Sequence, residues 1–335
     1  MIYLFKPNEI YYEKDIENYE LGKELLEKYK DVPKFLIENH NNIPEMRAKE
    51  NKEFGKMKHN LIIGTRKTHK YVENHKTSDF LVPYTSSGCS AMCLYCYLVC
   101  NYNKCSYMRL FVNREKMMEK IKKTVRTAEK ELTLEIGSNS DLILENTITN
   151  NLVWTIENFA DSSSGFLTFP TKFDMVDPIL NIKGKERIIV RMSVNPQEII
   201  SKVEFGTSAL MDRIKAVNKL KAAGYKVGLL VAPIVLVENW KEAYSGLFEI
   251  LATELSGEVK KDVFFELIFM TYSYVHRMIN QEAFPNAVEL YSPELMTGRG
   301  RGKYMYKPAV KMEATLFFED LLRRYFPENE VAYIV

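Results

Sequence analysis

The feature of this sequence that most constrains its fold is an alternation of strand-like and helix-like segments from Phe80 onward. Short apolar or β-branched runs recur with helical stretches between them, as in parallel β/α units. Six runs are predicted strands: Phe80–Tyr84, Leu132–Ile136, Phe166–Phe169, Ile188–Ser193, Lys226–Ala232 and Val263–Phe269. The predicted helices are Arg114–Lys130, Thr147–Phe159, Met175–Asn181, Ser208–Ala223 (with Ser208 as N-cap) and Trp240–Leu255. Because the common closed barrel has eight strands, six predict an α/β fold with an open, partial (β/α)6 barrel.

The segments on either side of this region lack its regular alternation of strands and helices, so we predict three parts in the chain. Residues 1–79 form an N-terminal α/β extension, 80–270 the partial barrel, and 271–335 a C-terminal β-hairpin plus helix. In the extension the predicted strands are Ile2–Phe5, Pro33–Ile37 and Leu61–Gly64, and the predicted helix is Tyr19–Tyr29. In the C-terminal part we expect a hairpin in Ser292–Lys307, a helix at Val310–Tyr325 and a strand at Val331–Val335.

Composition excludes several classes of protein. A net charge of only +2 argues against a protein that coats nucleic acid, although it allows a local basic groove. No segment approaches the ~20 apolar residues of a membrane span, and Met1–Lys6 lacks the basic start and long apolar core of a signal peptide. Five unevenly spaced cysteines do not suggest a disulfide framework. We therefore expect a cytoplasmic protein with no membrane association.

Three of the five cysteines, Cys89, Cys93 and Cys96, lie within eight residues at C-x3-C-x2-C spacing. Thiolates this close on one loop can face a common centre, as a metal cluster requires. A structural zinc takes four ligands, whereas a [4Fe–4S] cluster held by three thiolates leaves one iron open for another ligand. The motif follows the first predicted strand, on the edge of the barrel where catalytic loops lie. Spacing and placement favour a cluster, with a structural zinc or inert buried thiols as the alternatives.

The cysteine spacing, with an aromatic residue directly before the last cysteine, resembles the radical S-adenosylmethionine (SAM) enzymes. Within that superfamily the chain resembles the spore photoproduct lyases over roughly residues 60–335. The matching segments, in collinear order, are Gly64–Thr68, Gly88–Leu98, Thr171–Phe173, Ser193–Asn195, Phe205–Ser208, Ala223–Tyr225, Val231–Ile234, Phe265–Ile268 and Gly302–Tyr304. Each segment is short, but their shared order argues against chance.

The resemblance implies an activity and two cofactors. Spore photoproduct lyases reverse a thymine dimer in spore DNA with a SAM-derived radical. By this resemblance, Cys89, Cys93 and Cys96 hold a [4Fe–4S] cluster, and its open iron binds SAM. The implied SAM contacts are Ser140, Lys172, Ser193 and the backbone near Tyr95 and Ala232. A lysine can pair with the SAM carboxylate and hydroxyls can bind its ribose or methionyl end; ordinary polar strand ends are the alternative.

The sequence departs from the family where the radical is handled. Tyr97 matches the family tyrosine beside the cluster, implicated in handling the radical, with packing as the alternative role. Ser138 takes the place of the family's hydrogen-donating cysteine, and a serine O–H bond is too strong to yield a hydrogen atom to a thymine-type radical. Arg299 takes the place of a second tyrosine, proposed to relay the radical back to SAM. The family's repair cycle therefore cannot close through Ser138.

Two further cysteines, Cys100 and Cys105, follow the cluster motif on the same edge of the barrel. Either is a candidate replacement for the missing hydrogen donor. The alternatives are a buried structural thiol or an incidental residue.

The predicted hairpin carries a candidate DNA contact. Its basic and aromatic residues, at the family's lesion-binding position, are Arg299, Arg301, Lys303 and Tyr304. Such side chains can bind phosphates and insert between bases; the alternative is a solvated basic loop.

Three functions stay open on the sequence alone. The first is repair of a thymine photodimer in DNA by a variant route, and the second is a radical SAM enzyme of the same family with another substrate. The third is a non-catalytic DNA-binding relative, against which the three intact thiols argue. If the protein repairs a photodimer, we expect DNA as its partner. For either enzymatic function we expect flavodoxin or ferredoxin as the electron donor, and we expect a monomer.

Overall fold

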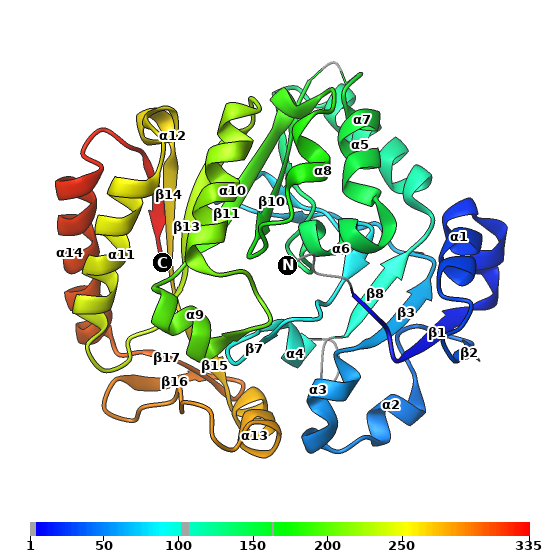
Figure 1. Ribbon diagram of the computed structural model, residues 1–335, viewed down its shortest axis with the longest axis horizontal. Helices are drawn as coiled ribbons and strands as arrows, with labels where there is room; N and C mark the ends of the chain where they lie inside the picture. The colour runs from blue at the N-terminus through cyan, green and yellow to red at the C-terminus, as the bar shows by residue number, and fades with distance from the viewer. Residues whose placement is uncertain (1–4, 102–106, 163) are drawn as a thin grey trace.

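The computed structural model describes residues 5–101, 107–162 and 164–335, with the backbone alone at residues 100 and 101. Two largely parallel sheets lie next to each other, and a small antiparallel sheet lies below the larger one (Figure 1).

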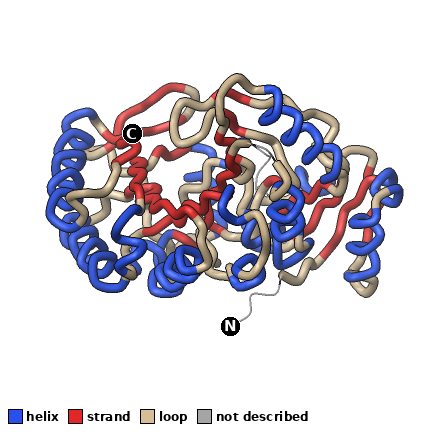
Figure 2. The backbone as a smooth tube through the Cα atoms, turned by 90° about the horizontal axis from the view of Figure 1, so that it is seen from above, coloured by secondary structure: helices blue, strands red, loops and turns tan. Residues whose placement is uncertain are grey.

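The larger sheet forms the partial barrel. It consists of β4 (Val72–Glu73), β5 (Phe80–Leu81), β9 (Thr133–Glu135), β10 (Phe166–Thr171), β11 (Ile188–Val194), β13 (Lys226–Ile234), β14 (Phe264–Phe269) and β18 (Val331–Ile334). Their order in space is β18-β14-β13-β11-β10-β9-β5-β4, and every neighbouring pair is parallel except β4–β5. The strands curve into an open arc with helices along its outer side (Figure 2). All six predicted strands are present, so the open barrel is confirmed, and the predicted C-terminal strand joins its edge as β18.

Helices follow most of the barrel strands. They are α5 (Arg114–Thr127), α6 (Leu142–Thr149), α7 (Asn151–Phe159), α8 (Asp177–Leu180), η3 (Lys185–Arg187), α9 (Gln197–Val203), α10 (Leu210–Ala222), α11 (Trp240–Glu254), α12 (Gly257–Asp262) and α14 (Pro308–Tyr325). The single helix predicted for Thr147–Phe159 is wrong, because Asn150 lies in the left-handed region at φ 57° and separates α6 from α7. Ser208 is not the N-cap of α10: Ala209 is, and the Ser208 hydroxyl bonds Asp174 instead.

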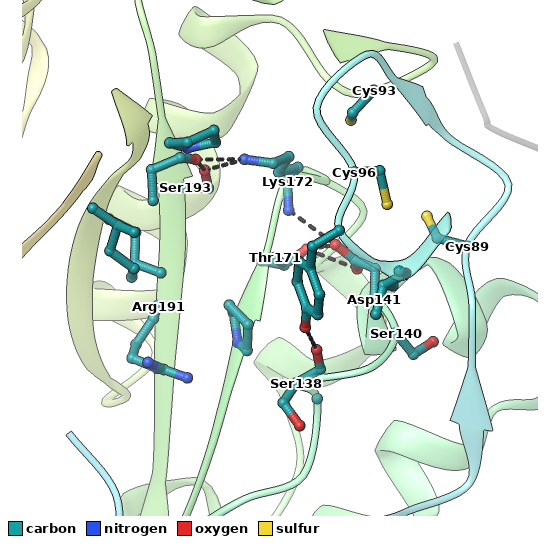
Figure 3. A pocket seen from close by; sticks show the side chains of 18 of the residues that line it. Cys89, Cys93, Cys96, Ser138, Ser140, Asp141, Thr171, Lys172, Arg191 and Ser193 are labelled. Atoms are coloured by element: carbon teal, nitrogen blue, oxygen red, sulfur yellow. Dashed lines mark hydrogen bonds between the residues drawn. The ribbon is translucent and has the colours of Figure 1, made fainter. Parts of the chain in front are cut away.

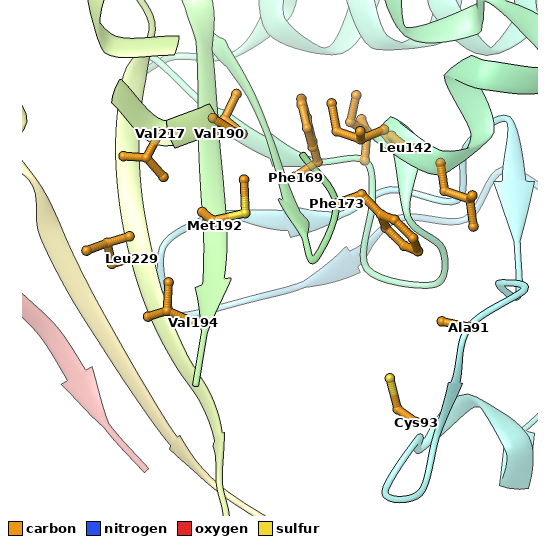
Figure 4. Close-up of a cluster of buried hydrophobic side chains, with 14 of the residues drawn as sticks. Ala91, Cys93, Leu142, Phe169, Phe173, Val190, Met192, Val194, Val217 and Leu229 are labelled. Carbon is orange, nitrogen blue, oxygen red and sulfur yellow. The ribbon is translucent and has the colours of Figure 1, made fainter. Parts of the chain in front are cut away.

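The two faces of β11 show how this sheet makes a core and a site at once. Successive side chains of a strand point to opposite faces. Val190, Met192 and Val194 are buried on the outer face, where Val217 of α10 lies (Figure 4). The alternate residues Arg191 and Ser193 line a cavity on the inner face. Burial of each such apolar side chain favours folding by about 1.5–3 kcal/mol, so the outer face stabilises the sheet while the inner face carries polar groups.

The smaller sheet combines segments from both sides of residue 79. It contains β1 (Glu9–Glu13), β2 (Lys34–Ile37), β3 (Asn60–Gly64), β6 (Ser86–Ser87) and β8 (Met108–Phe111), in the order β2-β1-β3-β8-β6. Helices η1 (Lys14–Asn18), α1 (Glu20–Lys28), α2 (Pro44–Ala48), η2 (Asn51–Glu53) and α3 (Phe54–Met57) connect its first strands. The strand predicted at Ile2–Phe5 falls outside the described residues except for Phe5, which is in no strand, and β1 was not predicted. The three-part domain division stays a prediction.

The remaining elements close the lower side of the barrel. The predicted hairpin is confirmed as β16 (Met296–Gly300) and β17 (Lys303–Tyr306), and β15 (Thr271–Ser273) pairs with β17. The others are β7 (Met92–Cys93), α4 (Leu98–Asn101), β12 (Glu204–Phe205) and α13 (Tyr274–Ala283). Among the described residues, none of the helices combines the length and apolar character that crossing a membrane requires.

Candidate active site

A cavity of about 470 Å³ lies on the inner face of the barrel sheet. Ten of the residues predicted for the site line it: Cys89, Cys93, Tyr95, Cys96, Tyr97, Ser138, Ser140, Lys172, Ser193 and Ala232. They come from the cysteine loop and from the ends of β9, β10, β11 and β13, which parallel pairing brings to one edge. The structure therefore unites residues that lie more than a hundred positions apart in the sequence.

The cysteine loop is fixed to the barrel by its backbone. Gly88, at φ 80°, donates its N–H to the carbonyl of Asn139 at 2.7 Å and accepts a hydrogen bond from the Ser140 hydroxyl at 3.0 Å. On the other side of the loop, Cys93 in β7 pairs with Glu204 in β12. Figure 3 shows Cys89, Cys93 and Cys96 around one side of the pocket. The loop thus presents all three thiols to the same cavity.

The donor set fits a [4Fe–4S] cluster. Burial raises the pKa of Cys89 to about 12 and raises that of Cys93 as well, so both thiols are neutral until a metal displaces the proton. In such a cluster each thiolate binds its own iron, so the three sulfurs need not converge on one ion. Among the described residues, no group of three His, Cys, Asp or Glu side chains could hold a single metal ion.

Lys172 stands at the centre of the predicted SAM contacts. Its ammonium group donates to the Ser193 hydroxyl at 2.5 Å and to the carbonyl of Ala232 at 2.7 Å (Figure 3). It also lies 5.6 Å from the centre of the Tyr95 ring. Three other predicted SAM contacts therefore meet around the Lys172 cation on the cavity wall.

Glu204 is a member of this network that the sequence did not reveal. It is fully buried, lies 3.3 Å from the Lys172 ammonium, and accepts hydrogen bonds from Tyr95 and Asn195. Arg213, also without exposed surface, donates to its other oxygen at 2.6 Å. Burial alone would raise the pKa of Glu204, but Lys172 and Arg213 lower it to about 2. The acid stays ionised and holds Lys172 in place.

Asp141 organises the next loop. Its carboxylate caps α6 by accepting from the N–H groups of Ile143 and Leu144, and it accepts from the Thr171 hydroxyl and the Lys172 N–H. An aspartate directly before an apolar helical run is a recognisable N-cap signal, so Asp141 was predictable. Glu204 had no such local signal, because its partners lie at distant positions.

Tyr97 and Ser138 are brought together at the mouth of the cavity. The Tyr97 hydroxyl donates to the backbone carbonyl of Ser138, while 53% of the Tyr97 side chain remains exposed. The Ser138 side chain faces the same cavity. Two of the three positions assigned to radical handling, Tyr97 and Ser138, are therefore in direct contact.

The predicted DNA residues lie on the hairpin, apart from the cavity lining. Arg299, Arg301 and Lys303 are exposed, and Arg301 has a left-handed backbone at φ 52° in the turn. Tyr304 is half-buried, with its ring 4.4 Å from that of Tyr291. Thr271 lines the cavity and pairs with Met305 of β17, so one strand separates the hairpin from the cavity.

The two candidate replacement donors are not placed. Cys105 lies outside the described residues, and only the backbone of Cys100, in α4, is described.

Comparisons with known proteins agree with this geometry. A family model described as spore photoproduct lyase matches residues 5–335. A spore photoproduct lyase of Bacillus subtilis (strain 168) is 32% identical, with 98% of each chain covered. A solved spore photoproduct lyase complexed with dinucleoside spore photoproduct gives a TM-score of 0.91 at 28% identity, covering 99% of this chain and 100% of the other. A mutant with bound AdoMet and the same dinucleoside also gives 0.91, at 27% identity and the same coverage.

Proposed function

Because this chain belongs to the spore photoproduct lyase family, we propose that it is a radical SAM lyase that reverses a thymine photodimer in DNA. The observation that carries the proposal is the shared cavity: three thiols of one loop and the Lys172 network open on the same space. A solved member of the family binds AdoMet and a dinucleoside spore photoproduct together.

The two proposed cofactors imply roles for residues of this chain. Cys89, Cys93 and Cys96 hold the [4Fe–4S] cluster, and Lys172 pairs with the carboxylate of SAM. When bound, the cluster and SAM supply a carbon-centred radical by one-electron cleavage of the sulfonium. Tyr95, Ser140, Ser193 and the carbonyl of Ala232 complete the SAM site, and Glu204 with Arg213 keeps Lys172 oriented.

Because Ser138 stands in place of the family's hydrogen-donating cysteine, another residue of this chain must donate the hydrogen atom. Ser138 cannot donate a hydrogen atom, and Tyr97, bonded to its carbonyl, is the side chain next to it. We propose that a thiol of the following loop, Cys100 or Cys105, replaces the family's donor. Cys100→Ala or Cys105→Ala should then divert the product toward radical by-products, and unchanged products in both variants would exclude a thiol donor from this loop.

A second candidate function follows from the same substitution. With Ser138 and Arg299 at the positions of the family's donor and relay, the radical-generating core can serve a different substrate. The two functions differ in one outcome, because a different substrate predicts SAM cleavage without any restored thymine.

The proposal also covers the DNA contact, the electron donor, the cellular location and the oligomeric state. The exposed cations Arg299, Arg301 and Lys303 bind DNA phosphates, with Tyr304 beside them. We propose a flavodoxin or ferredoxin as the electron donor, a cytoplasmic location and a monomeric enzyme.

The experiment that tests the function is an anaerobic assay of the reconstituted protein. Iron and sulfide content is measured first, and then dithionite, SAM and dinucleoside spore photoproduct are added. We expect cleavage of SAM and formation of the dinucleoside with two intact thymines, and chromatography measures both products. Cleavage without thymine would support the second function, and absence of both cluster and cleavage would favour a non-catalytic DNA-binding relative.

A further inference from the structure

A second polar wall lines the cavity on the side away from the cysteines. Its centre is Arg191, which lies two residues before Ser193 on β11 and therefore on the same inner face. Figure 3 shows Arg191 across the pocket from the three cysteines. Lys76, Thr77 and Glu135 line the cavity with it. These four residues, which we name the Arg191 wall, take no part in the SAM site described above.

The Arg191 wall is held by a buried ion cluster. Nη2 of Arg191 lies 2.6 Å from Oε2 of Glu135, and Nη1 lies 3.1 Å from Oε2 of Glu266 and donates to the Thr77 hydroxyl at 2.9 Å. The Arg191 and Glu135 side chains are 4% and 10% exposed, and Glu266 has no exposed surface. Glu266 also accepts from the Tyr333 hydroxyl. The carboxylate behind the arginine is thus satisfied by the protein.

Bonding capacity remains on the cavity side. In the part of the chain that the structure describes, Nε and Nη2 of Arg191 are both buried and without a partner in hydrogen-bond geometry, although Nη2 lies 2.6 Å from Oε2 of Glu135. No hydrogen bond among the described residues reaches Oε1 of Glu135, whose other oxygen, Oε2, faces Nη2 of Arg191. A buried N–H without a partner is costly, by the full desolvation of the group. Oε1 of Glu135 therefore remains an acceptor on the lining of the cavity, with Lys76 as a cation at its edge and the buried guanidinium of Arg191 behind it.

The ligand chemistry that matches this wall is an imide. A thymine base presents a carbonyl, an N3–H and a second carbonyl along one edge, in the order acceptor, donor, acceptor. Arginine and lysine can donate to the carbonyls, and a carboxylate can accept from N3–H.

We propose that the Arg191 wall binds the imide edge of one thymine of the lesion, with Lys76 donating to a carbonyl and Glu135, held in place by Arg191, accepting from N3–H. The proposal rests on the proposed function and adds to it the groups that read the base. Cytosine presents an acceptor at N3, so the carboxylate of Glu135 rejects it. The wall therefore selects thymine.

The first test modifies the ligand and leaves the protein unchanged. The reconstituted holoenzyme is saturated with SAM in the absence of reductant, and its affinity for dinucleoside spore photoproduct is measured by calorimetry. Two methylated forms are compared, each carrying N3-methyl on one of the two thymines. We expect one methyl group to weaken binding at least tenfold and the other less than threefold.

A matched pair of variants then locates the contact. Glu135→Gln has one amide oxygen, which Arg191 takes, so an NH2 group faces N3–H and the methylation penalty should fall below threefold. Glu266→Gln changes the other acid on the same guanidinium but leaves Glu135 in place, so the tenfold penalty should persist. Thermal melts ensure that folded molecules are compared.

Three outcomes overturn the inference. If the lesion binds and both methylated forms bind equally well, the imide is not read and this inference alone fails. If Glu135→Gln folds and keeps the full penalty, the imide is read elsewhere. If SAM binds but the unmodified lesion does not, the thymine-dimer function itself fails and the inference falls with it.

Discussion

The carboxyl edges of the two parallel sheets carry similar side chains but differ in what those side chains bond. In the smaller sheet, Glu13 ends β1 and accepts hydrogen bonds from the His40 ring at 2.8 Å and from the N–H groups of His40 and Thr65 at 3.0 Å. Gly64 fits beside this pair because a Cβ there would lie 2.7 Å from the Glu13 carboxylate. In the barrel sheet, Lys172 and Arg191 face a cavity. The polar strand ends of the barrel sheet therefore share a cavity with the three thiols, whereas Glu13 bonds groups of its own sheet edge.

The same electrostatic rule operates at both edges. Burial alone would raise the pKa of Glu13, but hydrogen bonds from the His40 ring, the His40 N–H and the Thr65 N–H lower it to about 2. Glu204 at the barrel edge is lowered to about 2 in the same way, by Lys172 and Arg213. An ionised buried acid therefore does not by itself distinguish a site from a structural clamp. What differs is that Glu204 supports a lysine that lines the cavity.

The largest effect should come from removing a proposed cluster ligand. We expect Cys93→Ala to lower iron content and SAM cleavage by more than about 100-fold, because even supporting residues around a metal typically change affinity by 10–100-fold. Iron and sulfide analysis with a SAM-cleavage assay measures this. Glu13→Gln, at the other edge, is the control and should retain the cluster in its folded fraction. Full iron content in Cys93→Ala would contradict the ligand assignment.

The next effect concerns Lys172, the cation of the proposed SAM site. Lys172→Met keeps the length of the side chain but removes its charge, and we expect SAM to bind about 10–100-fold more weakly, as for loss of a charge-assisted hydrogen bond. Equilibrium binding of SAM to the unreduced holoenzyme measures this. Lys219→Met removes an exposed lysine paired with Asp177 at 2.7 Å and should leave SAM affinity unchanged. Equal affinity in both variants would remove Lys172 from the site.

Glu13→Gln should affect stability instead of chemistry. A carboxyl whose pKa is lower in the folded chain stabilises the fold above its unfolded pKa and loses that contribution as pH falls toward the folded value. We therefore expect a deficit of about 2–3 kcal/mol in the free energy of unfolding at pH 7. The deficit should shrink between pH 4.5 and about 2. Urea unfolding at several pH values measures it, and a deficit that grew on acidification would reverse the argument.

The smallest effect is expected on the hairpin. Arg299→Gln should weaken DNA binding a few-fold and reduce the slope of log affinity against log salt by about 1, as for one lost phosphate contact. Fluorescence anisotropy with a short duplex at several salt concentrations measures the slope. Arg324→Gln, an exposed arginine on α14 paired with Asp320, is the control. An identical slope in both variants and the native protein would place DNA elsewhere.

Several parts of the fold were readable because their signals are local. The six strands predicted for the barrel are short apolar runs between helices, and their predicted bounds lie within a few residues of the observed ones. Strand β1 was missed because Glu9 and Glu13 enclose only three less polar residues. The break between α6 and α7 was missed because a single asparagine in a left-handed conformation ends one helix and begins the next.

The sequence by itself determined the class of chemistry and the type of fold. Cysteine spacing and the order of short segments are properties of the chain read in one direction, so they identified the family and its cofactors, which the comparisons confirm. Only the tertiary structure decided which polar residues share a wall. Arg191 meets Thr77 across 114 positions and Glu266 across 75, and Glu204 meets Tyr95 across 109. Such pairings are set by the strand order of a curved sheet, and no local pattern encodes them.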